Sequence, residues 1–160
     1  MKMNEGVEWA LHSCVNLCWI PGRPVTAKKL AAFYELPTAY LNKQLQALTR
    51  AGIMSSTSGP KGGFQLARRP EEITLLDVVV AIDGPDDAFR CTEIAKDAPN
   101  GDPAVDYRKT CLVGSSMRRA ELVYRRELAA RTVADIVADV EQNFPETATS
   151  TRDWFVAQTS

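Results

Sequence analysis

Four side chains in this sequence are suited to hold a metal ion, and they form two pairs far apart along the chain. Glu8 and His12, the only histidine, are spaced i, i+4 near the N-terminus. Residues at this spacing lie on one face of a helix, so the carboxylate and the imidazole could converge on one ion. Cys91 and Cys111 lie far downstream in an irregular segment. Because thiolate, imidazole and carboxylate all ligate metals, the two pairs together are a candidate metal site.

The alternative for the first pair is an exposed Glu–His contact, which contributes only about 0.2–0.5 kcal/mol. On a helical projection, Glu8 and His12 share a polar face with Glu5 and Asn16, opposite an apolar stripe. Cys14 and Cys18 belong to that stripe, so we interpret them as packed small hydrophobic residues rather than ligands.

The sequence predicts a cytoplasmic protein that does not contact a membrane. Its first residues, "MKMNEGVEW", lack the apolar core of a signal peptide, and charges or prolines interrupt every apolar run. In the cytoplasm, cysteines are thiols or metal ligands more often than disulfides.

Charge is distributed unevenly along the chain. Residues 1–70 carry nine Lys/Arg against three Asp/Glu, whereas residues 71–160 carry ten against seventeen. A basic N-terminal half followed by an acidic remainder indicates a head that binds a polyanion such as nucleic acid.

Three helices are expected in that basic half. The first covers residues 5–20 and ends at "PGRP"; Thr26 is placed to cap a short second helix, "AKKLAAFYEL". Pro37-Thr38 breaks the chain and opens a third helix, which Gly52 closes. Two short helices joined by a tight turn form a helix-turn-helix.

A β-hairpin is expected next, with its turn at "GPKGG", residues 59–63. Three helices followed by a hairpin make a winged helix-turn-helix, so the fold class is mainly α with a small β-hairpin wing. In such folds the third helix enters the major groove of double-stranded DNA, and the wing reaches the backbone or the minor groove. The candidate DNA-binding residues are Thr38, Tyr40, Lys43 and Gln44 on the third helix, Lys61 at the hairpin tip, and Lys28 and Arg50 for phosphate.

The remainder of the chain is expected to fold as four further pieces. "ITLLDVVVAIDG" is a helix with a capping box at Thr74 and Asp77, and it completes a DNA-binding domain over residues 1–84. Residues 85–116 form a loop, residues 117–144 one long dimerisation helix, and residues 145–160 a tail in which Trp154 and Phe155 could dock. A long helix with little of its own chain to pack against predicts a partner subunit.

The segments "LAAFYELPTAYLNKQLQALTRAG" and "GPKGGFQLARRPEEITLLDVVVAIDG" resemble the bacterial winged-helix repressors typified by IscR and NsrR. The resemblance covers roughly residues 5–143. It implies a homodimer crossed by long helices that binds palindromic DNA. It also implies, in many members, an iron–sulfur cluster held in the loop before the long helix.

The chain departs from that family in its loop, which has two cysteines where cluster-binding members typically have three. The resemblance also implies that relatives recruit a non-cysteine ligand, in some cases from the first helix across the dimer. Our hypothesis is therefore a [2Fe–2S] cluster bound by Cys91 and Cys111 of one subunit and by Glu8 and His12 of the other. Trp9, next to Glu8, would respond to the redox state of this cluster.

Several alternatives stay open on the sequence alone. The same four ligands could hold zinc, or Cys91 and Cys111 could form a reversible disulfide without any metal. A metalloenzyme is disfavoured because no second histidine or paired-carboxylate motif accompanies the Glu–His pair. An adaptor that has lost DNA binding is disfavoured by the basic head. The sequence thus predicts a transcriptional regulator and not an enzyme.

Overall fold

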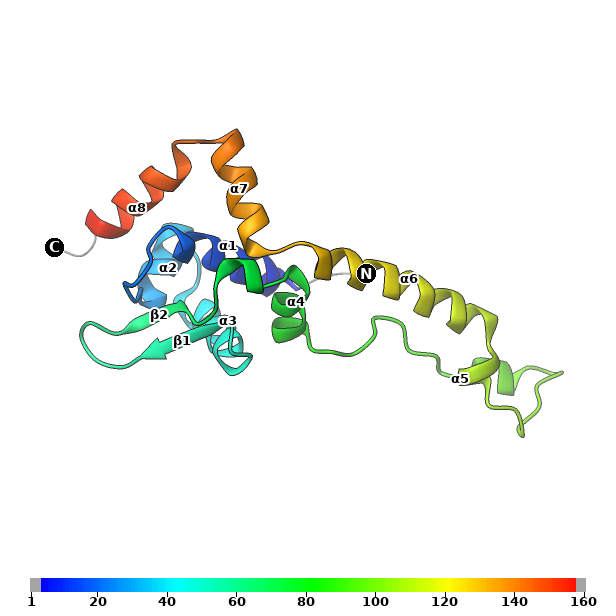
Figure 1. Ribbon diagram of the computed structural model, residues 1–160. Helices are drawn as coiled ribbons and strands as arrows, with labels where there is room; N and C mark the ends of the chain where they lie inside the picture. The colour runs from blue at the N-terminus through cyan, green and yellow to red at the C-terminus, as the bar shows by residue number, and fades with distance from the viewer. Residues whose placement is uncertain (1–3, 158–160) are drawn as a thin grey trace.

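The computed structural model describes residues 4–157 and is mostly helical (Figure 1). The helices are α1 Glu5–Cys18, α2 Ala27–Phe33, α3 Thr38–Arg50, α4 Leu75–Asp83, α5 Tyr107–Thr110, α6 Leu112–Ala130, α7 Val133–Asn143 and α8 Thr147–Ala157. Two 3-10 turns, η1 Pro70–Glu72 and η2 Ile94–Asp97, and the strands β1 Met54–Thr57 and β2 Gly63–Leu66 complete the order. The expected class, mainly α with one hairpin, is confirmed.

Helix α1 lies at the centre of the head, where it packs against α3, α4 and α7. The Asn4 side chain caps it by accepting a hydrogen bond from the Gly6 amide at 2.9 Å. Its apolar stripe is buried, with Cys14 fully inaccessible. This burial confirms that Cys14 is a packed residue, and Cys18 beside it is half-buried.

The helix-turn-helix is formed by α2 and α3. Thr26 caps α2, as expected, by accepting a hydrogen bond from the Lys29 amide at 3.3 Å. Helix α2 ends at Phe33, and Glu35 adopts a left-handed conformation with φ 54° in the turn. Pro37 then precedes the first turn of α3, where its fixed φ suits a helix start.

The wing is the antiparallel hairpin β1–β2, in which Met54 pairs with Leu66 and Thr57 with Gly63. Val25 adds an isolated bridge to Phe64, which ties the wing to the start of α2. Gly63 has φ 148°, and a Cβ there would lie 2.5 Å from the Val25 carbonyl carbon. Only glycine allows this close approach, so the wing is anchored to the helical head.

Helix α4 begins with the expected capping box. The Asp77 amide donates to the Thr74 hydroxyl, and the Thr74 amide donates to the Asp77 carboxylate, both at 3.0 Å. Gly84 ends the helix with φ 90°, a conformation that favours glycine.

The expectation of one helix over residues 117–144 is wrong. Helix α6 begins at Leu112 and ends at Ala130, and α7 starts only at Val133. Thr132 and Asp135 form a second capping box, which starts a new helix. The extended link also pairs with the segment before α4, through Leu75 N to Arg131 O at 2.9 Å and Val133 N to Ile73 O at 2.8 Å. These bonds turn α7 back onto the head.

Most of the described part of the C-terminal tail forms a helix, α8. Phe155 of α8 is buried and stacks on Phe33 of α2, with ring centroids 5.1 Å apart, and Trp154 meets Phe33 edge-on at 5.0 Å. The expected docking of Trp154 and Phe155 is therefore confirmed.

The molecule has a rounded head and a projecting arm (Figure 1). Helix α6 forms the arm, and α5 with the preceding loop lies at its far end. Within residues 4–157, no helix is both long enough and apolar enough to cross a bilayer.

Candidate functional site

The structure brings Cys91 and Cys111 together at the far end of the arm. Both cysteines are half-buried, and neither forms a disulfide. They flank Gly114, because a Cβ placed there would lie 3.8 Å from Cys111 Cβ and 3.9 Å from Cys91 Cβ. Gly114 itself is buried, and the two cysteines lie on either side of it at the start of α6.

Cys111 is the N-cap of α6, and its Sγ accepts a hydrogen bond from the Gly114 amide at 3.5 Å. That amide, together with the Val113 amide, the Cys91 side chain and the Arg118 charge, lowers the pKa of the Cys111 thiol, against some opposing desolvation. Helix N-termini favour thiolates because their free amides and macrodipole stabilise negative charge. Cys111 is therefore suited to act as a metal ligand or as a nucleophile.

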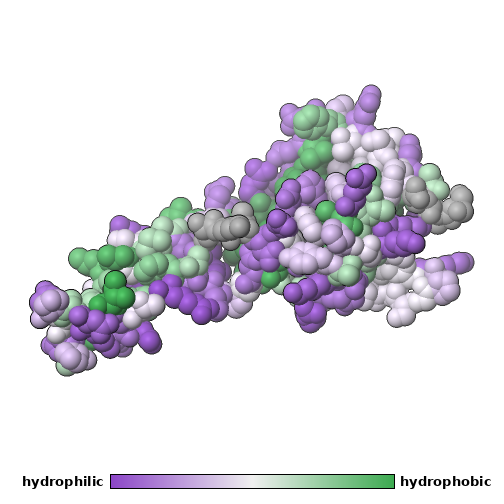
Figure 2. All heavy atoms as spheres, turned by 180° about the vertical axis from the view of Figure 1, so that it is seen from behind, coloured by the Kyte–Doolittle hydropathy of each residue, from purple (hydrophilic) through white to green (hydrophobic). Residues whose placement is uncertain are grey.

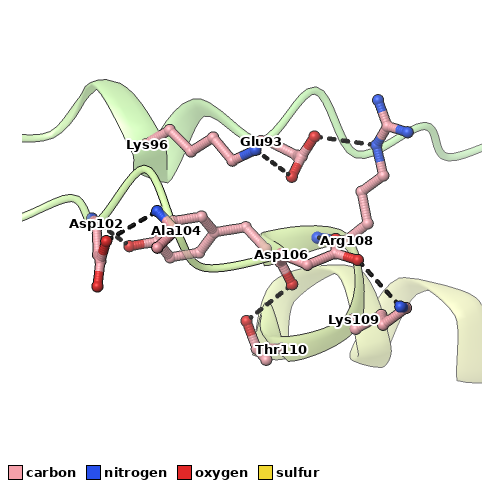
Figure 3. Close-up of polar contacts among 9 residues, drawn as sticks. Glu93, Lys96, Asp102, Ala104, Asp106, Arg108, Lys109 and Thr110 are labelled. Carbon is pink, nitrogen blue, oxygen red and sulfur yellow. Dashed lines mark hydrogen bonds and ion pairs between the residues drawn. The ribbon is translucent and has the colours of Figure 1, made fainter.

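The loop around these thiols is held by ion pairs and by a turn of helix, as Figure 3 shows. Glu93, at φ 60°, pairs with Lys96 and with Arg108, both at 3.1 Å. Arg108 in turn accepts a hydrogen bond through its carbonyl from Arg118 of α6 at 3.2 Å. The Asp102 amide donates to the Tyr107 hydroxyl at 3.0 Å. These contacts explain how so long a loop is held in place.

Glu8 and His12 both lie exposed on α1, as their spacing predicts. They line one rim of a groove of about 550 Å³ between α1, α4, α6 and α7. The floor of the groove is apolar and includes Val7, Leu11 and Val79. The carboxylate and the imidazole therefore stand beside an apolar surface that the chain itself leaves open.

The two pairs do not meet within one chain. Among residues 4–157, no three His, Cys, Asp or Glu side chains come close enough to hold a metal ion. Cys111 lies between α5 and α6, and in Figure 1 this junction is at the end of the arm, whereas α1 lies in the head. A four-ligand site that uses all of them therefore needs two chains.

His12 has a neighbour that the sequence did not indicate. Its Nδ1 lies 3.4 Å from the Tyr34 hydroxyl, which also donates to Asn16 Oδ1 at 3.2 Å. Asn16, which we expected on the polar face, is 2% exposed. The expectation is wrong because Tyr34, at the end of α2, covers this part of α1.

Trp9 connects α1 to α3, the helix expected to enter the major groove. Its ring meets that of Tyr40 edge-on, with centroids 5.0 Å apart. The Tyr40 hydroxyl also donates to Asn4 Oδ1, the cap of α1, at 3.2 Å. A residue of α3 thus contacts α1 beside Glu8.

Six of the seven expected DNA-binding residues are accessible. They are Thr38, Tyr40, Lys43 and Arg50 of α3, Lys28 of α2 and Lys61 at the wing tip, with Lys61 in the turn between the strands.

Gln44 is the exception. Its side chain is 4% exposed and packs under Gly6, where a Cβ would meet its Cδ at 2.7 Å. The expected base contact from Gln44 is therefore wrong in this conformation. Asn42, exposed on the same helix, was missed, although its amide could pair with adenine as Gln44 was expected to do.

The other two cysteines are unsuited to ligation. Burial raises the pKa of the Cys14 thiol far above its usual range. Burial also raises the pKa of Cys18 to about 12, and its thiol donates to the Cys14 carbonyl at 3.2 Å.

The chain is similar in sequence to known proteins over most of its length. Residues 3–139 match the family model Rrf2, described as an iron-dependent transcriptional regulator. Protein rrf2 of Nitratidesulfovibrio vulgaris is 31% identical over 73% of each chain. A putative helix-turn-helix regulator of Mycobacterium tuberculosis is 29% identical over 100% of this chain and 94% of its own. Two others, from Rhodopseudomonas palustris and Aquifex aeolicus, are matched over 51% and 55% of their length.

Solved structures share the fold. IscR of T. potens superposes with a TM-score of 0.66 at 22% identity, covering 90% of this chain and 91% of that one. Oxidised CymR of Staphylococcus aureus gives 0.62 at 22% identity, covering 86% and 96%. At this identity the likeness concerns the winged-helix architecture.

Proposed function

This chain belongs to the Rrf2 family of transcriptional regulators, and from that premise we propose that it is a homodimeric redox sensor that represses transcription at palindromic operators. The family membership makes it a DNA-binding helix-turn-helix regulator, and its named relatives are regulators rather than enzymes. The dimer, the sensor and the coupling between them are the parts of this proposal that go beyond family membership.

The dimer is supported by complementary apolar surfaces. Leu112, Val113, Leu122 and Val123 of α6 are 79%, 65%, 47% and 62% exposed. Figure 2 shows hydrophobic side chains along this arm. Large contiguous apolar patches usually mark protein contacts. We propose that α6 of one subunit packs in the groove of the other, beside the partner's α1.

The observation that carries the sensor is the placement of the two ligand pairs. Cys91 and Cys111 lie side by side at Gly114 on the arm, while Glu8 and His12 border the groove that would receive a partner's arm. Two thiols, one imidazole and one carboxylate make a set of four donors, the number that a [2Fe–2S] cluster needs. The residues present fit this group across a dimer.

When bound, a [2Fe–2S] cluster supplies a one-electron redox couple. The amides of Gly114 and Val113 stabilise the Cys111 thiolate, and Cys91 lies beside it across Gly114. Glu8 and His12 then fix the position of the partner's arm against α1. A change of charge at this junction would bias how two subunits sit, and hence how far apart their α3 helices are held.

The proposed DNA-binding residues would contact different parts of the duplex. Thr38, Tyr40, Lys43 and Asn42 would enter the major groove, Lys61 would reach the minor groove or the backbone, and Lys28 and Arg50 would bind phosphate. Because half-sites lie about one helical turn apart, a small rotation of one head costs affinity. Trp9, in contact with Tyr40, would carry the change at Glu8 towards α3.

The first test is an anaerobic absorption spectrum with iron and sulfide analysis. We expect a coloured protein with about two iron and two sulfide per site. Glu8→Ala and His12→Ala should each change the spectrum. An unchanged spectrum in both variants would refute the cross-subunit ligand set.

A mixed dimer tests directly whether the four ligands come from two subunits. One subunit carries Cys91→Ser and Cys111→Ser, and the other carries Glu8→Ala and His12→Ala, so that each homodimer lacks a full ligand set. If the ligands come from two chains, the mixed dimer regains one of its two sites. If they come from one chain, the mixed dimer binds no cluster.

A metal-free thiol switch is the second candidate. It is favoured by one observation, the proximity of the two cysteines: a Cβ on Gly114 would lie 3.8 Å from Cys111 Cβ and 3.9 Å from Cys91 Cβ. It predicts a colourless protein whose two loop thiols disappear together on oxidation. Zinc in the same site would also be colourless, but would be found by metal analysis at one ion per site.

A further inference from the structure

His12, Tyr34 and Asn16 form a hydrogen-bonded group on the Nδ1 side of the imidazole. The Tyr34 hydroxyl stands between His12 Nδ1, at 3.4 Å, and Asn16 Oδ1, at 3.2 Å. The imidazole and phenol rings are tilted by 60°, with centroids 5.3 Å apart. Three side chains from α1 and the end of α2 thus form one hydrogen-bonded row.

The direction of the hydrogen bonds in this row determines which nitrogen of His12 is available. A phenol hydroxyl has one proton, and Tyr34 donates it to the carbonyl oxygen of Asn16. Its oxygen can then only accept from His12, which requires the proton of a neutral imidazole to sit on Nδ1. Nε2 is left with its lone pair free.

We propose that Tyr34, oriented by Asn16, is a positioning residue that holds His12 in the Nδ1–H tautomer and presents Nε2 for ligation. This inference rests on the proposed function, since it concerns how a ligand of that site is prepared. Histidines that bind metals usually donate their other ring N–H to a protein group, which fixes the tautomer and the ring orientation.

Two members of this row pack against the head. Asn16 is 2% exposed and lies four residues after His12 on the same helix. The Tyr34 ring packs edge-on against Phe33 at 4.8 Å, and Phe33 in turn stacks on Phe155 of α8.

The position of Tyr34 in the chain adds a consequence for DNA binding. It caps the end of α2 and precedes Glu35, the left-handed residue of the helix-turn-helix turn. The imidazole of His12 is therefore bonded to the turn that sets the angle between α2 and α3. Movement of that ring would be transmitted to the turn directly.

The tautomer can be measured because the chain has only one histidine. The full-length, metal-free protein is labelled with ¹⁵N, and its imidazole is followed by NMR at mildly alkaline pH. We expect Nδ1 to be the protonated nitrogen and Nε2 the unprotonated one. A proton on Nε2 in the wild-type protein would mean that the row runs the other way and would overturn the inference.

The variant Tyr34→Phe keeps the ring and removes only the hydroxyl. We expect it to shift His12 towards the Nε2–H form that free histidine prefers. Tyr40→Phe, which removes a phenol hydroxyl bonded to Asn4 instead, should leave the tautomer unchanged. Equal effects of the two variants, or none from Tyr34→Phe, would contradict the assignment.

The loaded protein gives a second readout. Loss of an outer-shell partner costs about 10–100-fold in metal affinity, so Tyr34→Phe should release its metal group to a chelator at correspondingly lower chelator concentration than the wild type. An unchanged release would count against positioning. The two proposals fail on different measurements. If His12→Ala keeps the absorption spectrum of the wild type, His12 is not a ligand, whatever tautomer NMR finds in the metal-free protein. If NMR finds the proton on Nε2, the positioning role of Tyr34 fails and the ligand set is untouched.

Discussion

The indole of Trp9 meets the phenol of Tyr40 edge-on at 5.0 Å, which joins α1, the helix carrying Glu8 and His12, to α3, the helix that we propose enters the major groove. Edge-to-face aromatic pairs have a preferred geometry, so displacement of one ring disturbs the other. Because Tyr40 also bonds to Asn4, the start of α1 and the start of α3 are held together at two points.

This contact leads to the first prediction, that Trp9→Ala uncouples the sensor from DNA binding. Allosteric coupling typically changes affinity about 5–150-fold, and we expect the ratio of operator affinities between oxidised and reduced protein to fall towards one. Fluorescence anisotropy with labelled operator under both redox conditions measures it. Trp154→Phe, on α8 and away from Tyr40, is the control and should keep the wild-type ratio. A full redox response in Trp9→Ala would exclude this route of coupling.

A second prediction separates two neighbouring residues of α3. Lys43 is exposed, so Lys43→Ala should weaken operator binding and reduce the slope of log affinity against log salt concentration by about one if it meets a phosphate. Gln44 is buried under Gly6, so Gln44→Ala should lower the free energy of unfolding by roughly 1–3 kcal/mol. Urea unfolding and anisotropy, run on both variants, give the two quantities. If Gln44→Ala changes base preference at unaltered stability, Gln44 reads DNA and must leave its buried site to do so.

The third prediction concerns the break between α6 and α7. Thr132 caps α7 by accepting from the Asp135 amide at 3.2 Å, and loss of such a cap costs about 1 kcal/mol. Thr132→Ala should therefore destabilise the protein by about that amount in urea unfolding. In one continuous helix the same change would stabilise, because alanine has the higher helix propensity. The sign of the effect thus distinguishes the two arrangements, and Thr149→Ala on the exposed face of α8 serves as a comparison.

The head of the molecule was predictable from local signals, whereas the rest required tertiary contacts. Thr26, Thr74 and Gly84 act where they stand in the sequence, so the helix boundaries they set were confirmed. Thr132 gives the same kind of signal but lies inside an apolar helical pattern, which masked it. Its effect depends on pairing with Thr74, far away in the chain.

The residues of the candidate site were predictable from the sequence, but the contacts that other helices make with them were not. The i, i+4 spacing of Glu8 and His12 places both on an exposed face by helix geometry alone. The same geometry placed Asn16 there, and it failed because the phenol of Tyr34 packs over it from another helix. Burial of Gln44 likewise arises from Gly6, whose missing side chain lets α1 approach α3. Such contacts between elements leave no periodic trace in the sequence.

The final prediction uses the opposite pKa shifts of two cysteines in the fully reduced, metal-free protein. Amides at the start of α6 lower the pKa of Cys111, whereas burial raises the pKa of Cys18 to about 12. Since thiolates are the reactive form, alkylation by iodoacetamide should proceed at Cys111 below the ordinary thiol pKa of about 8.5 and should leave Cys18 unmodified in the folded protein. Mass spectrometry of peptides after timed alkylation across a pH series gives the midpoint for each residue.

The lowered pKa of Cys111 also makes the stability of the fold depend on pH. A group whose pKa is lower in the folded state stabilises the fold above its unfolded pKa, and this contribution is lost as the pH falls through the folded value. Cys111→Ser should therefore remove a stabilisation that the wild type gains only at alkaline pH, leaving the two proteins alike in weak acid. A Cys111 midpoint at or above that of a free thiol would show that the α6 amides do not hold a thiolate, and would remove the electrostatic basis for ligation by Cys111.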